Sequence, residues 1–154
     1  MQREIKFRAW DGDKKEMHLP EYTDPQNFHI YADGKIVFTE EYGYERHELT
    51  YGRPESWILM QFTGFHDKNK KDIYEGDIIN FINVDGNSIN TICKFGIARR
   101  EIFENVVDIM GFYFELPDGR KTFPIVNNYA GKHDLELFEV IGNIYQNPEL
   151  CKEK

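Results

Sequence analysis

One acidic loop contains residue types that bind divalent cations. Asp67, Asn69 and Asp72 present side-chain oxygens at the short spacing found at the start of a calcium loop. An EF-hand loop needs ligands at positions 1, 3 and 5, a glycine at position 6 and a bidentate carboxylate at position 12. Here position 5 is Lys71 and position 12 is Ile78, so the closing carboxylate is missing. We therefore interpret the segment as a solvated hairpin loop and expect no metal.

The other candidate metal ligands and nucleophiles are scattered along the chain. The histidines are His18, His29, His47, His66 and His133, and no two have the i, i+4 or H-x-H spacing of a metal site. Cys93 and Cys151 form no CxxC pair, and no nucleophile-elbow, phosphate-loop or dinucleotide-binding motif is present. The sequence therefore predicts no catalytic residue, no metal site and no cofactor. An enzyme with an unrecognised mechanism is kept as an alternative.

Basic residues form short clusters. The clusters are Lys68, Lys70 and Lys71; Arg99-Arg100; and Arg120-Lys121. Beside aromatic residues, such clusters can follow a nucleic-acid backbone, and small β-barrels bind single strands by stacking. The chain as a whole has 19 basic and 27 acidic side chains, a net charge of −8 at pH 7 that repels phosphates. We therefore expect these clusters to keep loop tips soluble, with a nucleic-acid-binding barrel as the alternative.

The elements that position these residues are predicted to be strands. The chain has 154 residues, enough for one domain or two very small ones. It holds 16 Ile and 6 Val against 7 Leu and 4 Ala, and 15% of its residues are aromatic. β-branched and aromatic side chains favour sheets, whereas Leu and Ala favour helices. The composition therefore predicts a mainly β fold and excludes a disordered chain.

The first strand is predicted over residues 4–10. Ile5, Phe7 and Ala9 alternate with charged residues, so we expect these three side chains to lie on a buried face. The turn residues 11–13 follow, and an extended run resumes after them. The pattern predicts a β-hairpin.

A second hairpin and a connector complete the predicted N-terminal unit, residues 1–54. The hairpin joins residues 28–31 to 35–39 through the turn residues Asp33-Gly34. The polar stretch 40–55, which contains glycine and proline breakers, indicates a connector to the rest of the chain.

Residues 55–154 are predicted to form the second domain. The expected elements are strands at 57–63 (ended by Gly64), 78–82 (entered from residues 73–77), 89–95, 110–116, 122–126 and 137–145, and a short helix from Asn147. Short strands joined by glycine-bearing turns are typical of a small barrel. On the fourth strand, strand alternation places one set of side chains in the core and the other outside. The inward set is Met110, Phe112, Phe114 and Leu116, and the outward set is Tyr113 and Glu115.

Gly76-Asp77 indicates how one strand begins. Glycine tolerates the positive φ of a sharp turn, and the aspartate carboxylate can accept backbone N–H groups. The pattern is similar to a strand entry in SH3-like barrels. We interpret five motif residues as structural rather than binding residues, and the binding residues stay unknown: Gly64, Gly76, Asp77, Gly142 and Asn143.

Three parts of the chain are the most distinctive. They are residues 3–11; residues 61–79, which hold Gln61 to Gly64, Asp67 to Asn69 and Ile73 to Ile79; and residues 140–150. In this order they resemble the YopX family of phage and prophage proteins. The resemblance implies a bacterial or phage origin and a C-terminal SH3-like barrel after a smaller β region, with no known enzymatic activity. Two positions depart from the family pattern: Lys70 replaces the usual Gly, which puts a tight turn there in doubt, and Phe65 replaces the commoner Leu.

These observations favour a non-enzymatic accessory protein that acts through protein–protein contacts with a phage or host protein. Residues 78–82 and 140–144 are apolar on both faces, so we also expect self-association into a homo-oligomer. The charged N-terminus lacks the apolar run of a signal peptide, and no run approaches the roughly 20 apolar residues that span a bilayer. The expected location is the bacterial cytoplasm, without membrane contact.

Overall fold

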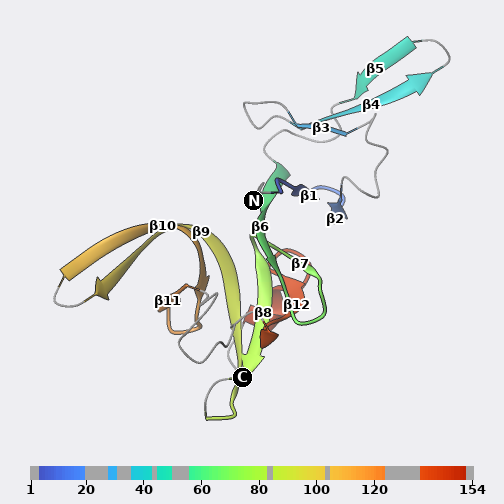
Figure 1. Ribbon diagram of the computed structural model, residues 1–154. Coiled ribbons are helices and arrows are strands. Elements are labelled where there is room, and N and C mark those ends of the chain that lie inside the picture. Colours follow the sequence, from blue (N-terminus) through green and yellow to red (C-terminus); the bar gives the residue numbers. More distant parts are fainter. Residues whose placement is uncertain are drawn as a thin grey trace. The chain divides into compact units, whose positions relative to one another are not determined.

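The computed structural model describes residues 4–19, 28–30, 36–42, 45–49, 56–82, 85–102, 105–123 and 136–151. These residues form strands β1 to β12 and a 3-10 helix, η3 (Pro148–Cys151), near the C-terminus (Figure 1). The prediction of a mainly β fold is confirmed. The chain divides into two compact units. We call Ile5–Gln61 the N-terminal unit and Phe62–Lys154, with Met1–Glu4, the C-terminal unit.

The N-terminal unit contains the predicted first hairpin. Strand β1 (Phe7–Asp11) pairs antiparallel with β2 (Glu16–His18) and with the first half of β6 (Trp57–His66). At the turn, Asp11 Oδ1 accepts hydrogen bonds from the backbone N–H groups of Asp13 (2.9 Å) and Lys14 (3.0 Å). The aspartate side chain therefore holds the turn that the sequence predicted.

The expected alternation along β1 is only partly correct, since Ala9 is buried as predicted and Phe7 is partly buried. Ile5 is 67% exposed, whereas Arg8, Ala9 and Trp10 are all buried. Ile5 precedes the first residue of the strand, Phe7, so no paired strand covers it. Arg8 lies on the face predicted to be polar, yet it is only 6% exposed.

The N-terminal unit also contains a three-stranded antiparallel sheet. Its order is β3 (Phe28–Ile30), β4 (Ile36–Tyr42) and β5 (Glu45–Leu49). The β3–β4 pairing confirms the second predicted hairpin, and its turn residues lie outside the described residues. The prediction of a connector from residue 40 is wrong, because β4 and β5 pair through this segment. Ladder hydrogen bonds join backbone groups, so a strand of polar residues leaves little hydropathy signal.

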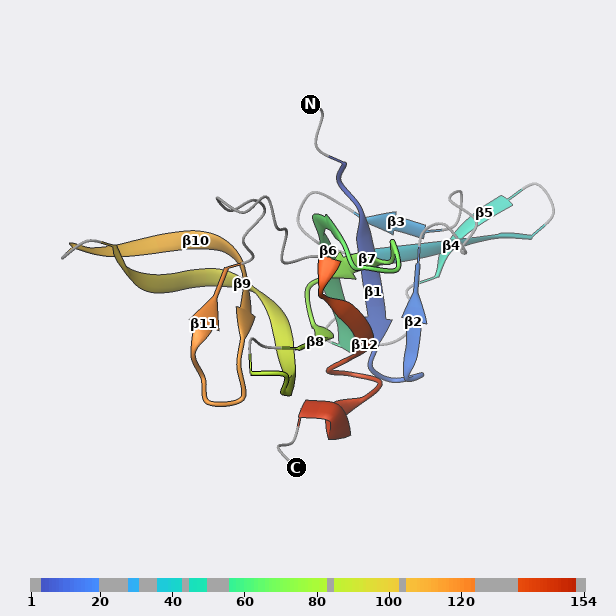
Figure 2. The same cartoon turned by 60° about the horizontal axis from the view of Figure 1, so that its bottom comes forward.

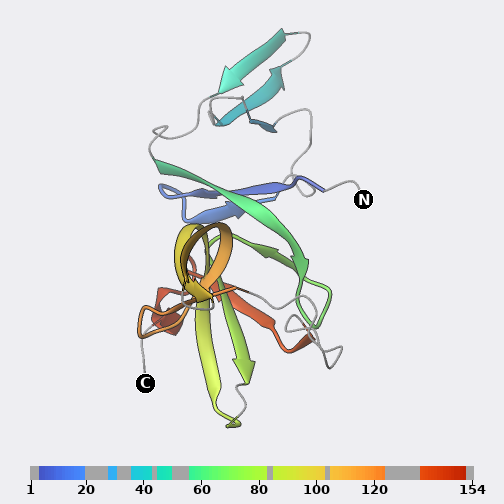
Figure 3. The same cartoon turned by 60° about the vertical axis from the view of Figure 1, so that its left-hand side comes forward.

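The C-terminal unit is built on an antiparallel five-stranded sheet of order β11-β10-β9-β8-β12. These strands are β8 (Asp77–Ile82), β9 (Ser88–Ile102), β10 (Asn105–Glu115), β11 (Lys121–Thr122) and β12 (Glu139–Asn143). Figure 3 shows β9 and β10 curling together. A curled antiparallel sheet is compatible with the SH3-like barrel, which stays a prediction.

Strand β6 does not end at Gly64, contrary to prediction. It continues to His66 and pairs there with β7 (Asp72–Tyr74), after a register shift between Phe62 and His66. Gly64 has a φ of 89°. Because the glycine forms a bulge, the chain absorbs its positive φ without leaving the sheet.

The core of the C-terminal unit lies between its curled strands. Its buried members are Ile73, Ile79, Cys93, Phe114, Phe138 and Val140. The rings of Phe114 and Phe138 meet edge to face, with centroids 5.0 Å apart. This contact joins β10 to the segment just before β12.

The predicted burial along β10 is only partly correct. Phe114 is buried and Phe112 packs against the core, but Met110 is 69% exposed and Tyr113 is buried. Glu115 is partly buried and pairs with Lys94. The reason is the length of β10: its outer half pairs with β9 beyond the point where the other strands can cover it.

Candidate functional site

Gly76 and Asp77 form the turn that the sequence predicted. Gly76 has a φ of 80°, its N–H donates to the Cys93 carbonyl and its own carbonyl accepts from Ile144 N–H. Asp77 Oδ2 accepts the backbone N–H of Tyr74 at 2.8 Å. This buried carboxylate is used to hold the chain and is not directed at a ligand.

Gly142 and Asn143 also determine the local backbone conformation. The β8–β12 register shifts between Val140 and Gly142. Asn143 Oδ1 then accepts the backbone N–H groups of Tyr145 (3.1 Å) and Gln146 (2.9 Å). A Cβ on Gly142 would collide with the Asn147 side chain, so glycine is needed for close approach.

Asp67, the first residue of the apparent calcium loop, is buried and fully engaged. Its Oδ1 accepts the N–H groups of Asn69 (2.8 Å) and Lys71 (2.9 Å), and its Oδ2 accepts that of Val140 (3.0 Å). Burial raises the pKa of Asp67, but these backbone hydrogen bonds outweigh it and hold the pKa below its ordinary value. The carboxylate therefore ties the loop to β12.

The described residues contain no cluster of three or more His, Cys, Asp or Glu side chains able to hold a metal ion. His66 Nε2 lies 2.9 Å from Asp72 Oδ1, and the His18 ring packs 5.2 Å from that of Trp57. His133 lies outside the described residues, and nothing is described of the His29 and His47 side chains.

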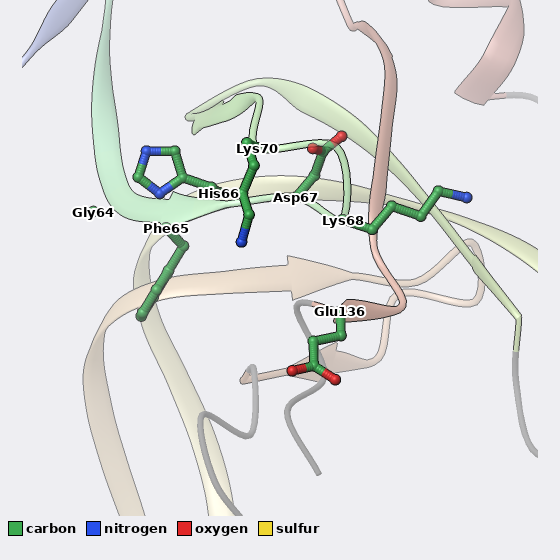
Figure 4. Close-up of a pocket in the computed structure, with 7 residues that line it drawn as sticks. All are labelled: Gly64, Phe65, His66, Asp67, Lys68, Lys70 and Glu136. Carbon is green, nitrogen blue, oxygen red and sulfur yellow. The ribbon is translucent and has the colours of Figure 1, made fainter.

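A surface cavity of about 400 Å³ lies beside the β6–β7 turn (Figure 4). Its lining residues are Gly64, Phe65, His66, Asp67, Lys68, Lys70 and Glu136. Figure 4 shows Lys70 and Glu136 on different sides of the space, while the Lys68 side chain points away from it. Neither Lys70 nor Glu136 forms an ion pair with another described residue. The cavity could receive a small ionic group, but it lacks a nucleophile hydrogen-bonded to a base.

Basic residues of every predicted cluster have local partners. Lys68 pairs with Glu139 at 2.7 Å, Arg99 with Asp108 at 3.0 Å, and Arg120 with Asp118 at 2.6 Å. The Lys121 ammonium lies 4.8 Å from the centre of the Tyr113 ring. These carboxylates cancel much of the positive charge that a phosphate backbone would need.

Exposed apolar side chains gather instead on the β9–β10 hairpin. They are Phe95 (49% exposed), Ile97 (59%), Val106 (60%) and Met110 (69%). Strand alternation and the β9–β10 register place them on one face, which also includes the partly buried Phe112. We call this set of five residues the ribbon face. Figures 1 and 2 show the outer part of the hairpin extending away from β8 and β12.

The ribbon face was not predicted from the sequence because Met110, which is 69% exposed, was assigned to the core. The apolar pattern runs from the buried Phe114 to the exposed Met110, is interrupted by Asp108 and resumes at Val106. The detectable signal was the length of the extended segment, since the 11 residues of β10 exceed the width of a small barrel wall.

The fold and these sites define a mainly β protein whose turns are held by buried polar side chains and which exposes, among the residues that the structure describes, an apolar face on a two-stranded ribbon. The sequence model of the YopX protein family matches residues 6–152, and the chain belongs to this family. The resemblance found in the sequence is therefore confirmed.

Two solved structures share the fold. Protein EF1440 from Enterococcus faecalis is 24% identical, with a TM-score of 0.52 over 98% of this chain and 100% of that one. Protein yopX from Bacillus subtilis is 23% identical, with a TM-score of 0.54 over 94% of this chain and 96% of that one. No curated protein matches the chain. The described residues include no helix with the length and apolarity needed to cross a membrane.

Proposed function

We propose that this protein is a non-enzymatic accessory protein of phage or prophage origin that acts by binding other protein chains through the ribbon face. The observation that carries the proposal is the exposure of Ile97 and Met110, which lie directly opposite each other on β9 and β10. A contiguous apolar patch on a folded protein marks an interaction surface, because leaving it in water is unfavourable.

The absence of catalysis is part of the proposal. Buried polar side chains are the usual candidates for catalytic groups, since burial shifts their pKa values. Here Asp67 and Asp77 accept backbone N–H groups, and the Thr63 hydroxyl donates to the Ile73 carbonyl at 2.8 Å. These interactions account for the burial of all three side chains without a reaction.

Phage origin rests on the resemblance to phage and prophage proteins. A cytoplasmic location is supported by the two cysteines, Cys93 and Cys151, which are both free thiols. Free thiols persist in the reducing cytoplasm.

Affinity capture from lysogenic or infected cells tests the proposal. The tagged chain is compared with the double variant Ile97→Lys/Met110→Lys and with the control Ile82→Lys, because Ile82 is 61% exposed and lies on β8 of the same unit. We expect the same proteins to be captured by the wild type and the control and lost from the double variant. Equal capture by all three would remove the ribbon face from the proposal.

Nucleic-acid binding is the alternative. It is disfavoured by the net charge of −8 and by the carboxylate partners of Lys68, Arg99 and Arg120. A gel shift with single-stranded DNA and RNA at low salt tests it, because phosphate contacts are strongest there. We expect no shift, and a shift that disappears with rising salt would favour the alternative.

A further inference from the structure

We infer that the ribbon face binds the ribbon face of a second copy of this chain. The two faces stack on each other and are related by a two-fold axis that lies between them, at the level of the Ile97–Met110 pair. This inference rests on the proposed function and specifies its partner. It is carried by the order of side chains along the ribbon, by their charges and by the two-stranded character of the outer hairpin.

The ribbon carries three cross-strand pairs in a row on this face. The Phe95 and Phe112 rings lie 5.1 Å apart, Ile97 faces Met110 in the next pair, and Arg99 bonds Asp108 beyond it. Successive pairs are two residues apart on each strand, about 7 Å. The apolar pair is thus flanked at equal distances by an aromatic pair and an ionic pair.

This order is self-complementary. A two-fold axis in the interface, perpendicular to the strands, places Ile97 on Ile97 of the partner subunit. The same rotation places Phe95 against Arg99 of the partner subunit, and it does so twice, as a two-fold contact requires. A guanidinium on an aromatic face is a favourable contact. On the other strand, the Phe112 ring edge, which is positive, approaches Asp108 of the partner subunit.

Charge also favours a second copy over a strongly charged partner. Arg99 and Asp108 neutralise each other, so the three central pairs of the face carry no net charge. The chain as a whole carries −8. Glu101, which lies opposite Val106 at the outer end of the face, adds one negative charge there, so only the centre of the face is neutral. This neutral apolar centre is where two such chains can approach with least repulsion, and it offers an acidic or basic partner little attraction.

Stacking on a second copy would bury the apolar face of the outer β9–β10 hairpin. Strand β9 pairs with β8 only through Ser88–Ile92, and β10 pairs with β11 only at Phe114 and Glu115. Beyond these positions, the described strands leave β9 and β10 as a two-stranded ribbon, which is marginally stable alone. Two ribbons stacked face to face give a small sandwich with a shared apolar layer.

Light scattering behind a sizing column tests the inference on the full chain over a range of micromolar concentrations. We expect the wild type and Ile82→Lys to reach the mass of two chains as concentration rises. We expect Ile97→Lys/Met110→Lys to keep the mass of one chain. Circular dichroism and a thermal melt show whether the double variant is folded. A wild-type mass of one chain at every concentration overturns the inference.

Cysteine cross-linking tests the geometry and does not depend on a disruptive variant. In a Cys151→Ser background, Ile97→Cys is compared with Ile82→Cys under oxidised glutathione. Because Ile97 lies at the axis, we expect a disulfide-linked dimer at least ten-fold more abundant for Ile97→Cys. Equal cross-linking at the two positions contradicts the two-fold arrangement.

The two tests separate this inference from the proposed function. A chain that stays monomeric and does not cross-link, but loses captured proteins in the double variant, excludes the second copy and keeps the interaction module. A monomeric chain whose captured proteins are unaffected by the double variant excludes both.

Discussion

At Lys70 the backbone has a φ of 67°, in the left-handed region where a side chain is strained. The resemblance to the YopX pattern led us to expect glycine here and put the tight turn in doubt. The turn nevertheless forms: Lys70 N–H donates to the Asp67 carbonyl at 3.0 Å. The hydrogen bonds that Asp67 makes to the same loop hold the strained residue in place.

Replacing Lys70 with glycine should therefore stabilise the protein. Relief of left-handed strain is worth about 1–2 kcal/mol, and the added flexibility of glycine in the unfolded chain takes back about 0.4–1 kcal/mol. We expect Lys70→Gly to gain about 0.5–1 kcal/mol in urea denaturation. Lys70→Ala removes the same charge but keeps the Cβ, so it should show no gain. An equal gain from alanine would assign the effect to charge.

Asp67 gives a pH-dependent prediction. Asparagine at this position keeps one oxygen acceptor but turns its amide group toward the Val140 N–H, a donor. We expect Asp67→Asn to lose about 2 kcal/mol or more at pH 7, since a hydrogen bond to a charged group is lost and a buried donor is left unpaired. Chemical denaturation measures the loss, with Glu136→Gln as a control for removing an exposed carboxylate.

The loss should shrink in acid. The pKa of Asp67 is lower in the folded chain than in the unfolded chain, whose value is about 3.9. The stabilisation from the carboxylate is therefore complete above this unfolded value and is lost as pH falls through the folded pKa. A difference between wild type and Asp67→Asn that stays constant from pH 7 to pH 3 would contradict this role.

At the scale of elements, β10 separates core from surface within one strand. Phe114 is 1% exposed and Met110 69% exposed, although both lie on the same face. We expect Phe114→Ala to lose about 3–5 kcal/mol, because it leaves a cavity in the core. Met110→Ala should change stability by less than about 0.5 kcal/mol, as surface substitutions do. Urea denaturation of both variants, at concentrations where the chain is monomeric, checks the register; similar losses at the two sites would mean that it is wrong.

The same strand shows how far sequence reasoning reaches. Alternation correctly put Phe112 and Phe114 on one face, because that depends only on backbone geometry. It did not show that this face changes from buried to exposed between Phe114 and Met110. That change depends on neighbouring strands, which come from elsewhere in the chain. Gly76 and Asp77 were predictable for the opposite reason: a positive φ and a carboxylate three residues from its donor are local features.

Other features were not predictable because their partners are distant or polar. Lys68 looked like a free basic residue, yet its partner Glu139 belongs to β12. Strand β5 was missed because Glu45–Leu49 has few apolar residues, and its pairing with β4 uses backbone groups. The length of β10 hinted at the ribbon face, but which of its residues are uncovered depends on how far the neighbouring strands extend.

At the scale of the whole molecule, the net charge of −8 opposes any self-association. Two copies repel each other over a distance that salt controls, because the screening length falls from about 30 Å at 0.01 M to about 8 Å at 0.15 M. The ion pair on the ribbon face, Arg99 with Asp108, forms within one chain and is exposed, so it contributes little on its own. Apolar burial is the main attraction between two ribbon faces, and salt at these concentrations leaves it nearly unchanged.

Raising the salt concentration from about 0.01 M to about 0.15 M should therefore strengthen the dimer, since it weakens the repulsion between whole chains more than the local attraction. Sedimentation at both salt concentrations measures the dimer fraction at fixed protein concentration, and Ile82→Lys, which changes the net charge without touching the ribbon face, should show a smaller salt effect. A dimer that weakens with salt would mean that Arg99, Asp108 or other charges attract across the interface more strongly than the chains repel. In that case the contact would be ionic in character, and the apolar pair Ile97–Met110 would not be its centre.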